Sequence, residues 1–265
     1  MFLSNVFDDV GSLLSKEEYV NWILQGLAGT VVIALIGTLG GLLIGIFLAF
    51  GKRLVIEKNS PWYQKLWKYP LRWLATVYSV IVRGTPMMVQ ALLFQQLFLL
   101  FGVNFNNIWN DVPVFNGWFL AGSIIIVLNT TAYMGEIIIA GLNGVGQDQI
   151  EGAKALGMND FQILIHVTLP QAIKNSIPTI GNELIVNIKD SSVLNVISAT
   201  ELFFQAKTIA GKSYKYMAIY LIIAACYLLL TLLATAILKI VSMKLEGKKI
   251  NWSFFHYSNP KMKGD

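Results

Sequence analysis

The chain has 265 residues, of which 55% are hydrophobic and only 13% are charged, whereas soluble domains carry about 25% charged residues. This composition argues against a free cytosolic protein, and the grouping of apolar residues into long blocks indicates an all-α integral membrane protein. The formal net charge of +5 comes from basic residues beside those blocks, where they set topology, so nucleic-acid binding is not expected.

The chain is expected to begin with an external segment, residues 1–18. Four acidic residues there outnumber a single lysine, the reverse of the basic start of a signal peptide, so we expect no cleavage. A first membrane span is predicted at 22–50, because about 20 apolar residues cross a hydrocarbon layer of ~30 Å. Gly37, Gly41 and Gly45 make one smooth face on this helix, which favours close packing against another helix.

The segment 52–72 carries six basic residues and one acid. By the positive-inside rule this segment is cytoplasmic and the N-terminus is external. A short interfacial helix is predicted at 71–82, followed by a second span from near Pro86 to about residue 101. The two are separated because the sequence Arg83-Gly84-Thr85-Pro86 would break a uniform helix.

An external loop at 102–116 is expected to lead into a third span at 117–141. Residues 142–169 include four charges within 13 positions, which a bilayer core would not accept without partners, so they are predicted to form a cytoplasmic excursion. The fourth segment, 170–196, contains Pro178 and buried charges, and is expected to be irregular. After an external stretch with three lysines, the last span is predicted at 217–238.

These spans give five crossings, with the N-terminus outside and the C-terminus inside. Four lysines lie within about a dozen residues after the last span, at positions 239, 244, 248 and 249, and favour a cytoplasmic end. The chain therefore divides into the external segment, one membrane domain at 19–241 and a cytoplasmic tail at 242–265.

Residues 146–169 are predicted to form two short helices joined by a sharp turn. Good helix formers run from Gln149 to Leu156, Gly157 is a natural stop residue, and Asn159 or Asp160 can cap the second helix. The apolar face of the second helix is expected to contain Phe161, Leu164 and Ile165. A charged helix pair held outside the bilayer suits docking into a groove on another protein, although an inert connecting loop would have the same spacing.

The order Glu-x-Ala-x3-Gly, followed later by Leu-Pro, resembles the EAA loop of ABC importer membrane subunits. The positions on or beside this pattern are Gln149, Glu151, Gly152, Ala153, Gly157, Asp160, Leu169 and Pro170. Gly152 departs from the family, which usually has alanine there, and glycine costs the helix about 1 kcal/mol relative to alanine.

Further motifs resemble, in order, the polar amino acid permease family from about residue 25 to 240. Those outside the loop and the fourth segment are Arg83, Gly84, Thr85, Pro86, Gln90, Tyr133 and Glu136. Glu136 also fits a simple interfacial position, and Arg83 also fits an anchor at the cytoplasmic face. His166, alone on an amphipathic helix, is expected to have no catalytic role.

The resemblance implies a type I ABC import permease in the bacterial plasma membrane. Two permease subunits, identical or homologous, would form the path within the lipid bilayer. Two ATPase subunits would use ATP and Mg, and an external binding protein would deliver an amino acid. This chain would bind no cofactor itself. Its nearest approach to a phosphate loop, residues 206–213, lacks the first glycine of that motif.

The fourth segment is the predicted substrate path. A zwitterion crossing a low-dielectric interior needs groups of both signs, because an unpaired buried charge is costly. The candidate lining residues are Asn182, Glu183, Asn187, Lys189, Asp190, Ser191 and Ser192. A structural ion pair of Lys189 with Asp190 at a helix break is the alternative.

Two other functional classes compete with the importer. An ion-coupled secondary transporter of a small polar solute would also use buried charges at broken helices, but five spans without a second inverted half are few for such a fold. A membrane-embedded enzyme is disfavoured because the likely interior has no metal-ligand cluster and no nucleophile–base set. With Cys226 as the single cysteine, neither a disulfide nor a cysteine-based metal site can form within the chain.

Overall fold

The computed structural model describes residues 2–54, 56, 61–103, 105 and 116–245. Within these ranges the regular structure is helical and includes no strand. The elements are α1 (Phe2–Leu14), α2 (Glu17–Lys52), α3 (Trp62–Gly84), α4 (Met87–Leu100), α5 (Gly117–Asn143), α6 (Gln147–Ala155), α7 (Asp160–Ile163), the π-helical turn η2 (Leu164–Thr168), α8 (Leu169–Asp190), the 3-10 helix η3 (Ser191–Ile197), α9 (Leu202–Ser213) and α10 (Tyr216–Leu245).

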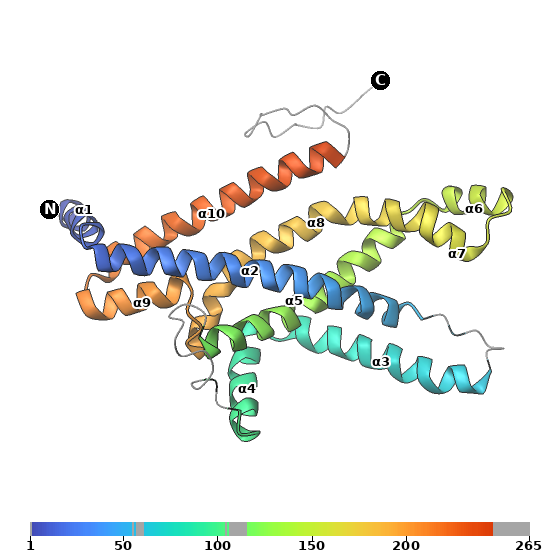
Figure 1. The fold of residues 1–265 in the computed structure, drawn as a ribbon, viewed down its shortest axis with the longest axis horizontal. Helices are drawn as coiled ribbons and strands as arrows, with labels where there is room; N and C mark the ends of the chain where they lie inside the picture. Colours follow the sequence, from blue (N-terminus) through green and yellow to red (C-terminus); the bar gives the residue numbers. More distant parts are fainter. Residues whose placement is uncertain (1, 55, 57–60, 104, 106–115, 246–265) are drawn as a thin grey trace.

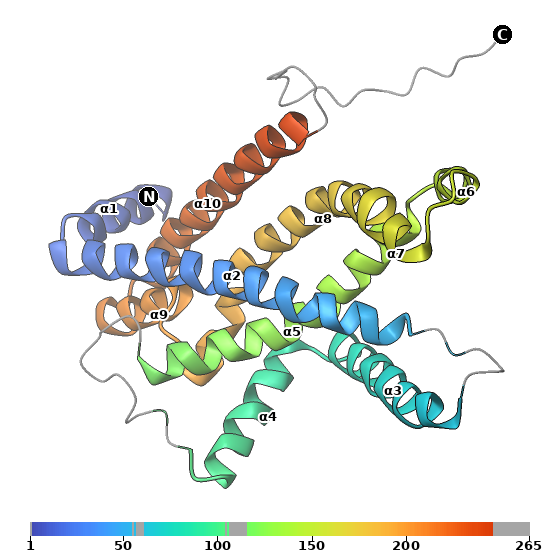
Figure 2. The same ribbon diagram turned by 45° about the vertical axis from the view of Figure 1, so that its right-hand side comes forward.

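Helices α2, α5 and α8 pack together through the centre of the molecule (Figures 1 and 2). Helices α6 and α7 lie at one end, and α1 and α9 lie at the other. Helix α10 runs from the α1 end toward the α6 end, beside α8. The described residues thus form a long bundle with distinct elements at its two ends.

The predicted glycine face of the first span is confirmed. A Cβ atom added to Gly41 would lie 2.7 Å from the Thr130 side chain, and one added to Gly45 would lie 2.7 Å from Met134. Both neighbours belong to α5, so two long helices approach backbone to backbone along this stripe.

Among the described residues, three helices are long and apolar enough to cross a membrane: α2, α5 and α10. The prediction of a full second span near Pro86 is wrong for α4 alone, because its 14 residues reach only ~21 Å. Helix α3 is also longer than the predicted interfacial helix, and it joins α4 at a bend of 114°. The two helices together are either one broken span or a re-entrant pair.

Helix α8 has 22 residues, about 33 Å at 1.5 Å per residue, which is long enough to span a bilayer. Its polar side chains keep it out of the set of apolar spans. The five-crossing count and the side of each terminus therefore stay predictions. Most of the expected loop at 102–116, and the tail beyond residue 245, lie outside the described residues.

The two segments expected to lie outside the membrane are helical. In the N-terminal segment, α1 packs on α10, and Asp9 pairs with Lys215 at 2.7 Å. In the second segment, the sequence Gly211-Lys212-Ser213 ends helix α9, with the Lys212 ammonium 4.1 Å from the centre of the Trp22 ring. This phosphate-loop-like sequence is thus a helix terminus held by an aromatic ring and not a loop.

Candidate functional site

The predicted helix–turn–helix at 146–169 is confirmed in its geometry. Helix α6 ends at Ala155, and Gly157 has a φ of 80°, the left-handed conformation that favours glycine. Asn159 is the cap of α7: its side chain accepts a hydrogen bond from the Gln162 N–H at 2.9 Å, while the Gln162 side chain accepts one from the Asn159 N–H. This reciprocal cap satisfies two backbone donors and fixes the residue at which α7 begins.

The tip of this helix pair exposes apolar and acidic side chains together. Leu156 is 85% exposed and Phe161 is 71% exposed, while Glu151 and Asp160 are exposed beside them. Phe161, predicted to lie on the apolar face of this helix, is on its exposed side, whereas Ile163 is the buried residue of α7. An exposed apolar pair with an acidic rim is typical of a protein-docking surface.

Helix α7, the π turn η2 and α8 form one continuous helical segment from Asp160 to Asp190. Pro170, near the start of α8, cannot donate a backbone hydrogen bond, and its ring would crowd the carbonyl of the preceding turn in a regular helix. The wider π turn directly before it relieves this conflict. The exposed helix pair is therefore joined to the membrane interior without a flexible connection.

Residues from two family motifs meet Lys52 in one charged cluster. The Glu136 carboxylate accepts a hydrogen bond from the Lys52 ammonium and forms an ion pair with the Arg83 guanidinium at 3.2 Å. The Arg83 guanidinium also lies over the Tyr133 ring, 5.7 Å from its centre. The cluster ties the C-terminal ends of α2 and α3 to α5.

Gln90 holds the corner between α3 and α4. Its amide nitrogen donates to the carbonyl of Val82 at 2.8 Å and to the hydroxyl of Thr85 at 2.8 Å. Its amide oxygen accepts from Asn129 of α5 at 2.9 Å. Pro86 begins α4 as its N-cap. The Arg-Gly-Thr-Pro motif and Gln90 thus form one locked corner.

The predicted path residues on α8 separate into two groups. Asn182 and Lys189 are exposed, and Glu183 and Asp190 are half-buried. In contrast, Ser191 is fully buried and donates to the carbonyl of Ile188, and the Ser192 hydroxyl donates to the carbonyl of Lys189 at 2.7 Å. Both serine hydroxyls therefore donate to backbone carbonyls at the end of α8 and not to a solute on its exposed side.

Asn187, one of the predicted path residues, is buried between helices and does not lie on the exposed side of α8. Its amide oxygen accepts from the Thr130 hydroxyl at 2.9 Å, and its amide nitrogen donates to the Thr38 hydroxyl at 2.9 Å. Asn187 shares a helix face with Glu183, but α2 closes that face at this level, where Gly37 has no side chain. Asn187 therefore links α2, α5 and α8 and is only 3% exposed.

A cavity with four polar side chains in its lining, which the sequence did not predict, lies between α5 and α8. It has a volume of about 340 Å³ and is lined by Glu136, Ile137, Ala140, Gly141, Asn175, Ser176 and Thr179. Asn175, Thr179 and Asn182 follow the spacing i, i+4, i+7 and so extend one polar stripe along α8 from this cavity. This spacing is the feature of the sequence that could have predicted the stripe. Its side chains are uncharged, and uncharged side chains in a membrane segment indicate function less strongly than Glu183 or Lys189.

The arrangement can be compared with known proteins. A sequence profile described as "Binding-protein-dependent transport system inner membrane component" matches residues 65–247. The chain belongs to this family. It is 33% identical over 234 residues, covering 88% of this chain and 97% of the relative, to the "Putative glutamine transport system permease protein GlnP" of Rickettsia bellii. It is 32% identical over 229 residues, covering 86% and 94%, to the "Arginine transport system permease protein ArtQ" of Bacillus subtilis.

Solved structures agree with this assignment. The chain matches the structure titled "Crystal structure of an amino acid ABC transporter with histidines" with a TM-score of 0.74 and 34% identity, covering 88% of this chain and 98% of that one. The methionine ABC transporter MetNI matches with a TM-score of 0.62 at 14% identity, covering 85% and 99%, which supports the fold alone.

The predicted identity as an importer permease is therefore confirmed. The chain is a multi-pass permease subunit of the bacterial inner membrane. Its family argues against the ion-coupled secondary transporter that the sequence alone left open. The coupling role of residues 146–169 and the substrate role of α8 stay predictions, because similarity along the chain does not test single side chains.

Proposed function

We propose that this permease imports a polar or charged amino acid, using ATP and Mg bound by separate ATPase subunits. The relatives named for glutamine and arginine transport support the solute class. The observation that carries the proposal is the polar stripe of α8, which continues from the cavity beside Glu136. A second permease subunit would face this stripe and close the path.

The stripe and its surroundings carry both signs of charge that a zwitterion needs. Glu183 and Asp190 offer carboxylates to an ammonium group, and Lys189 offers a cation to a carboxylate. Asn182 and Thr179 can donate and accept neutral hydrogen bonds beside them. A path lined in this way favours amino acids over solutes of a single charge sign.

The exposed helix pair is proposed to dock on the ATPase. Leu156 and Phe161 would supply the apolar contact, and Glu151 would supply charge at its edge. The continuous segment from α7 to α8 would transmit rotation of the docked pair to the polar stripe. This design joins the ATPase and the solute path through one rigid element.

The proposed orientation places α6, α7 and the Lys52 end of α2 in the cytoplasm. The opposite end, with α1 and α9, would then face the external binding protein that delivers the solute. The basic residues in 52–72 support this choice. Cysteines can be introduced at Ser4 and Ser258 in a chain with Cys226 replaced. A membrane-impermeant thiol reagent should label the two positions from opposite sides of the membrane. Labelling of both from one side would contradict the orientation.

Uptake in reconstituted vesicles tests the function. The permease, its ATPase and its binding protein would be placed in liposomes, and uptake of radiolabelled glutamine, arginine and a neutral sugar would be followed with ATP on the α6 side. Uptake of an amino acid is expected only with ATP, and should not respond to a sodium or proton gradient. Uptake driven by an ion gradient without ATP would contradict the proposal.

Variants on α8 locate the path. Asn182→Ala and Thr179→Val should raise the KM for uptake about three- to tenfold, the effect of one lost hydrogen bond. Thr235→Val is the matched control, because the Thr235 hydroxyl is exposed on α10 and bonds only to the Thr231 carbonyl in its own helix. An unchanged KM in both α8 variants would move the path away from this stripe.

A further inference from the structure

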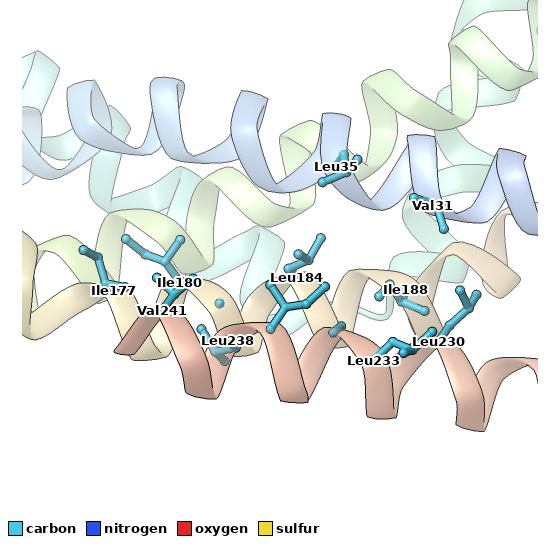
Figure 3. A pocket seen from close by; sticks show the side chains of 13 residues that line it. Val31, Leu35, Ile177, Ile180, Leu184, Ile188, Leu230, Leu233, Leu238 and Val241 are labelled. Atoms are coloured by element: carbon cyan, nitrogen blue, oxygen red, sulfur yellow. The ribbon is translucent and has the colours of Figure 1, made fainter. Parts of the chain in front are cut away.

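A second cavity lies on the opposite side of α8 from the polar stripe. It is a groove of about 450 Å³ between α2, α8 and α10, and its lining side chains are all apolar (Figure 3). Val31 and Leu35 close it from α2, and Leu184 projects into it from α8. The groove cannot serve a polar solute, because it offers no hydrogen-bonding side chain.

The groove is as long as one leaflet of a bilayer. Ile177 and Val241 lie at one end, and Ile188 and Leu230 lie at the other (Figure 3). Positions 230 and 241 of α10 are 11 residues apart, which is about 17 Å along a helix. Half of a hydrocarbon core of ~30 Å is about 15 Å. One extended acyl chain would therefore fit along it from end to end.

The groove narrows where α8 and α10 meet. A Cβ atom added to Gly181 would overlap the Leu238 side chain of α10. The absence of a side chain at position 181 therefore lets α10 approach α8 at this level, while α2 forms the third wall. The result is a channel between three helices and not a flat lipid-facing surface.

Two lysines flank the same end of the groove. Lys174 is three residues before Ile177 on α8, and Lys244 is three residues after Val241 on α10, so each lies one helical turn beyond the lining. Both are exposed. This end faces the α6 end of the molecule (Figures 1 and 2). Lysines at a helix end reach toward the headgroup layer.

We propose that this groove holds one acyl chain of an anionic phospholipid whose headgroup phosphate is bound by Lys174 and Lys244. An apolar channel of one-leaflet length with cations at one end matches an amphiphile with a negative head. Within a bilayer, a lipid tail gains no hydrophobic free energy by leaving other lipid tails for apolar side chains. Selectivity for this lipid must therefore come from the shape of the groove and from the two lysines. The proposal does not depend on which solute is transported.

Photolabelling of the assembled importer tests the proposal. The complex would be reconstituted with phosphatidylglycerol that carries a photoreactive group on its acyl chain, and the labelled peptides would be identified by mass spectrometry. Label is expected on residues 177–188 and 230–241, and unlabelled phosphatidylglycerol should displace it better than phosphatidylcholine. Each of Lys174→Gln and Lys244→Gln should reduce this preference about fivefold, whereas Lys207→Gln on α9 should leave it unchanged.

A matched pair of substitutions tests the groove itself. Ala234→Trp fills the groove and should abolish the label, whereas Ala236→Trp lies outside the lining on the same helix and should keep it. Equal displacement by phosphatidylcholine would overturn the role of the lysines. Absence of label from the groove in the assembled importer would overturn the proposal that a phospholipid occupies it. That result would indicate that a second permease subunit covers the site.

Discussion

Glycines serve opposite purposes at the centre and at the exposed end of this permease. At Gly41 and Gly45 a single added carbon would overlap α5, so the absence of a side chain permits packing. At Gly152 and Gly157, in the exposed helix pair, an added Cβ would meet nothing within 4 Å. In the interior, the available space limits which side chains can replace glycine. In the exposed helix pair, only the backbone conformation limits the replacement. We therefore expect substitutions at the centre to act on folding and those at the exposed end to act on coupling.

The largest effect is expected at the packed centre. Gly41→Ala places a Cβ 2.7 Å from the Thr130 side chain, so α2 and α5 must separate, which costs about 1–3 kcal/mol or more. The thermal midpoint of the purified protein in detergent should fall clearly, and the yield of monodisperse protein should fall with it. Gly211→Ala is the matched control, because its Cβ has open space in α9. Equal midpoints for the two variants would show that the glycine stripe does not limit the packing.

The next effect is expected at the turn between α6 and α7. Gly157→Val forces a β-branched residue into a φ of 80°, which costs about 1–2 kcal/mol or distorts the turn. ATP-driven uptake should fall at least tenfold, while membrane insertion and the thermal midpoint change little. Retention of full uptake by a well-inserted Gly157→Val variant would demote the helix pair to a connector.

The two asparagines of α8 separate folding from transport within one helix. Asn187→Ala leaves the Thr130 and Thr38 hydroxyls without their buried partner, so the free energy of unfolding should fall by about 1–3 kcal/mol. Asn182→Ala, on the exposed stripe, should leave stability unchanged and raise the KM. Thermal midpoints and uptake curves measured on the same preparations check both expectations. A loss of stability in both variants would mean that the stripe is buried in the assembled permease.

Local signals in the sequence were sufficient for the helix–turn–helix. Gly157 and Asn159 each act on their own backbone neighbours, so their roles could be read without knowing the fold. The first span and its glycine face were equally clear, because length and a four-residue repeat are properties of one helix. The prediction of a separate second span failed because the break at Pro86 was visible, whereas the upstream extent of α3 was not.

Residues whose role depends on a neighbouring helix were not predictable in this way. Asn187 lies four residues after Glu183, a spacing that predicts a shared helix face, but the approach of α2 closes this face at Asn187. Glu201 was not singled out, although it is fully buried, caps α9 by accepting from the Phe203 and Phe204 N–H groups, and accepts from the Tyr227 hydroxyl at 2.8 Å. Glutamate is an uncommon N-cap, and its partner in α10 lies 26 residues away.

The smallest effect is expected where glycine serves neither packing nor conformation. Gly152 lies inside α6, makes no close approach, and does not have a positive φ. Gly152→Ala should therefore stabilise α6 by about 1 kcal/mol, because alanine lowers the backbone entropy of the unfolded chain. Slower hydrogen exchange of the α6 amides would measure this gain, with the α9 amides as an internal reference. If ATPase docking selects the ordered helix, uptake should rise slightly or stay constant. A decrease in uptake with slower exchange would instead mean that α6 must open during the transport cycle, and would place flexibility at Gly152 among the requirements of coupling.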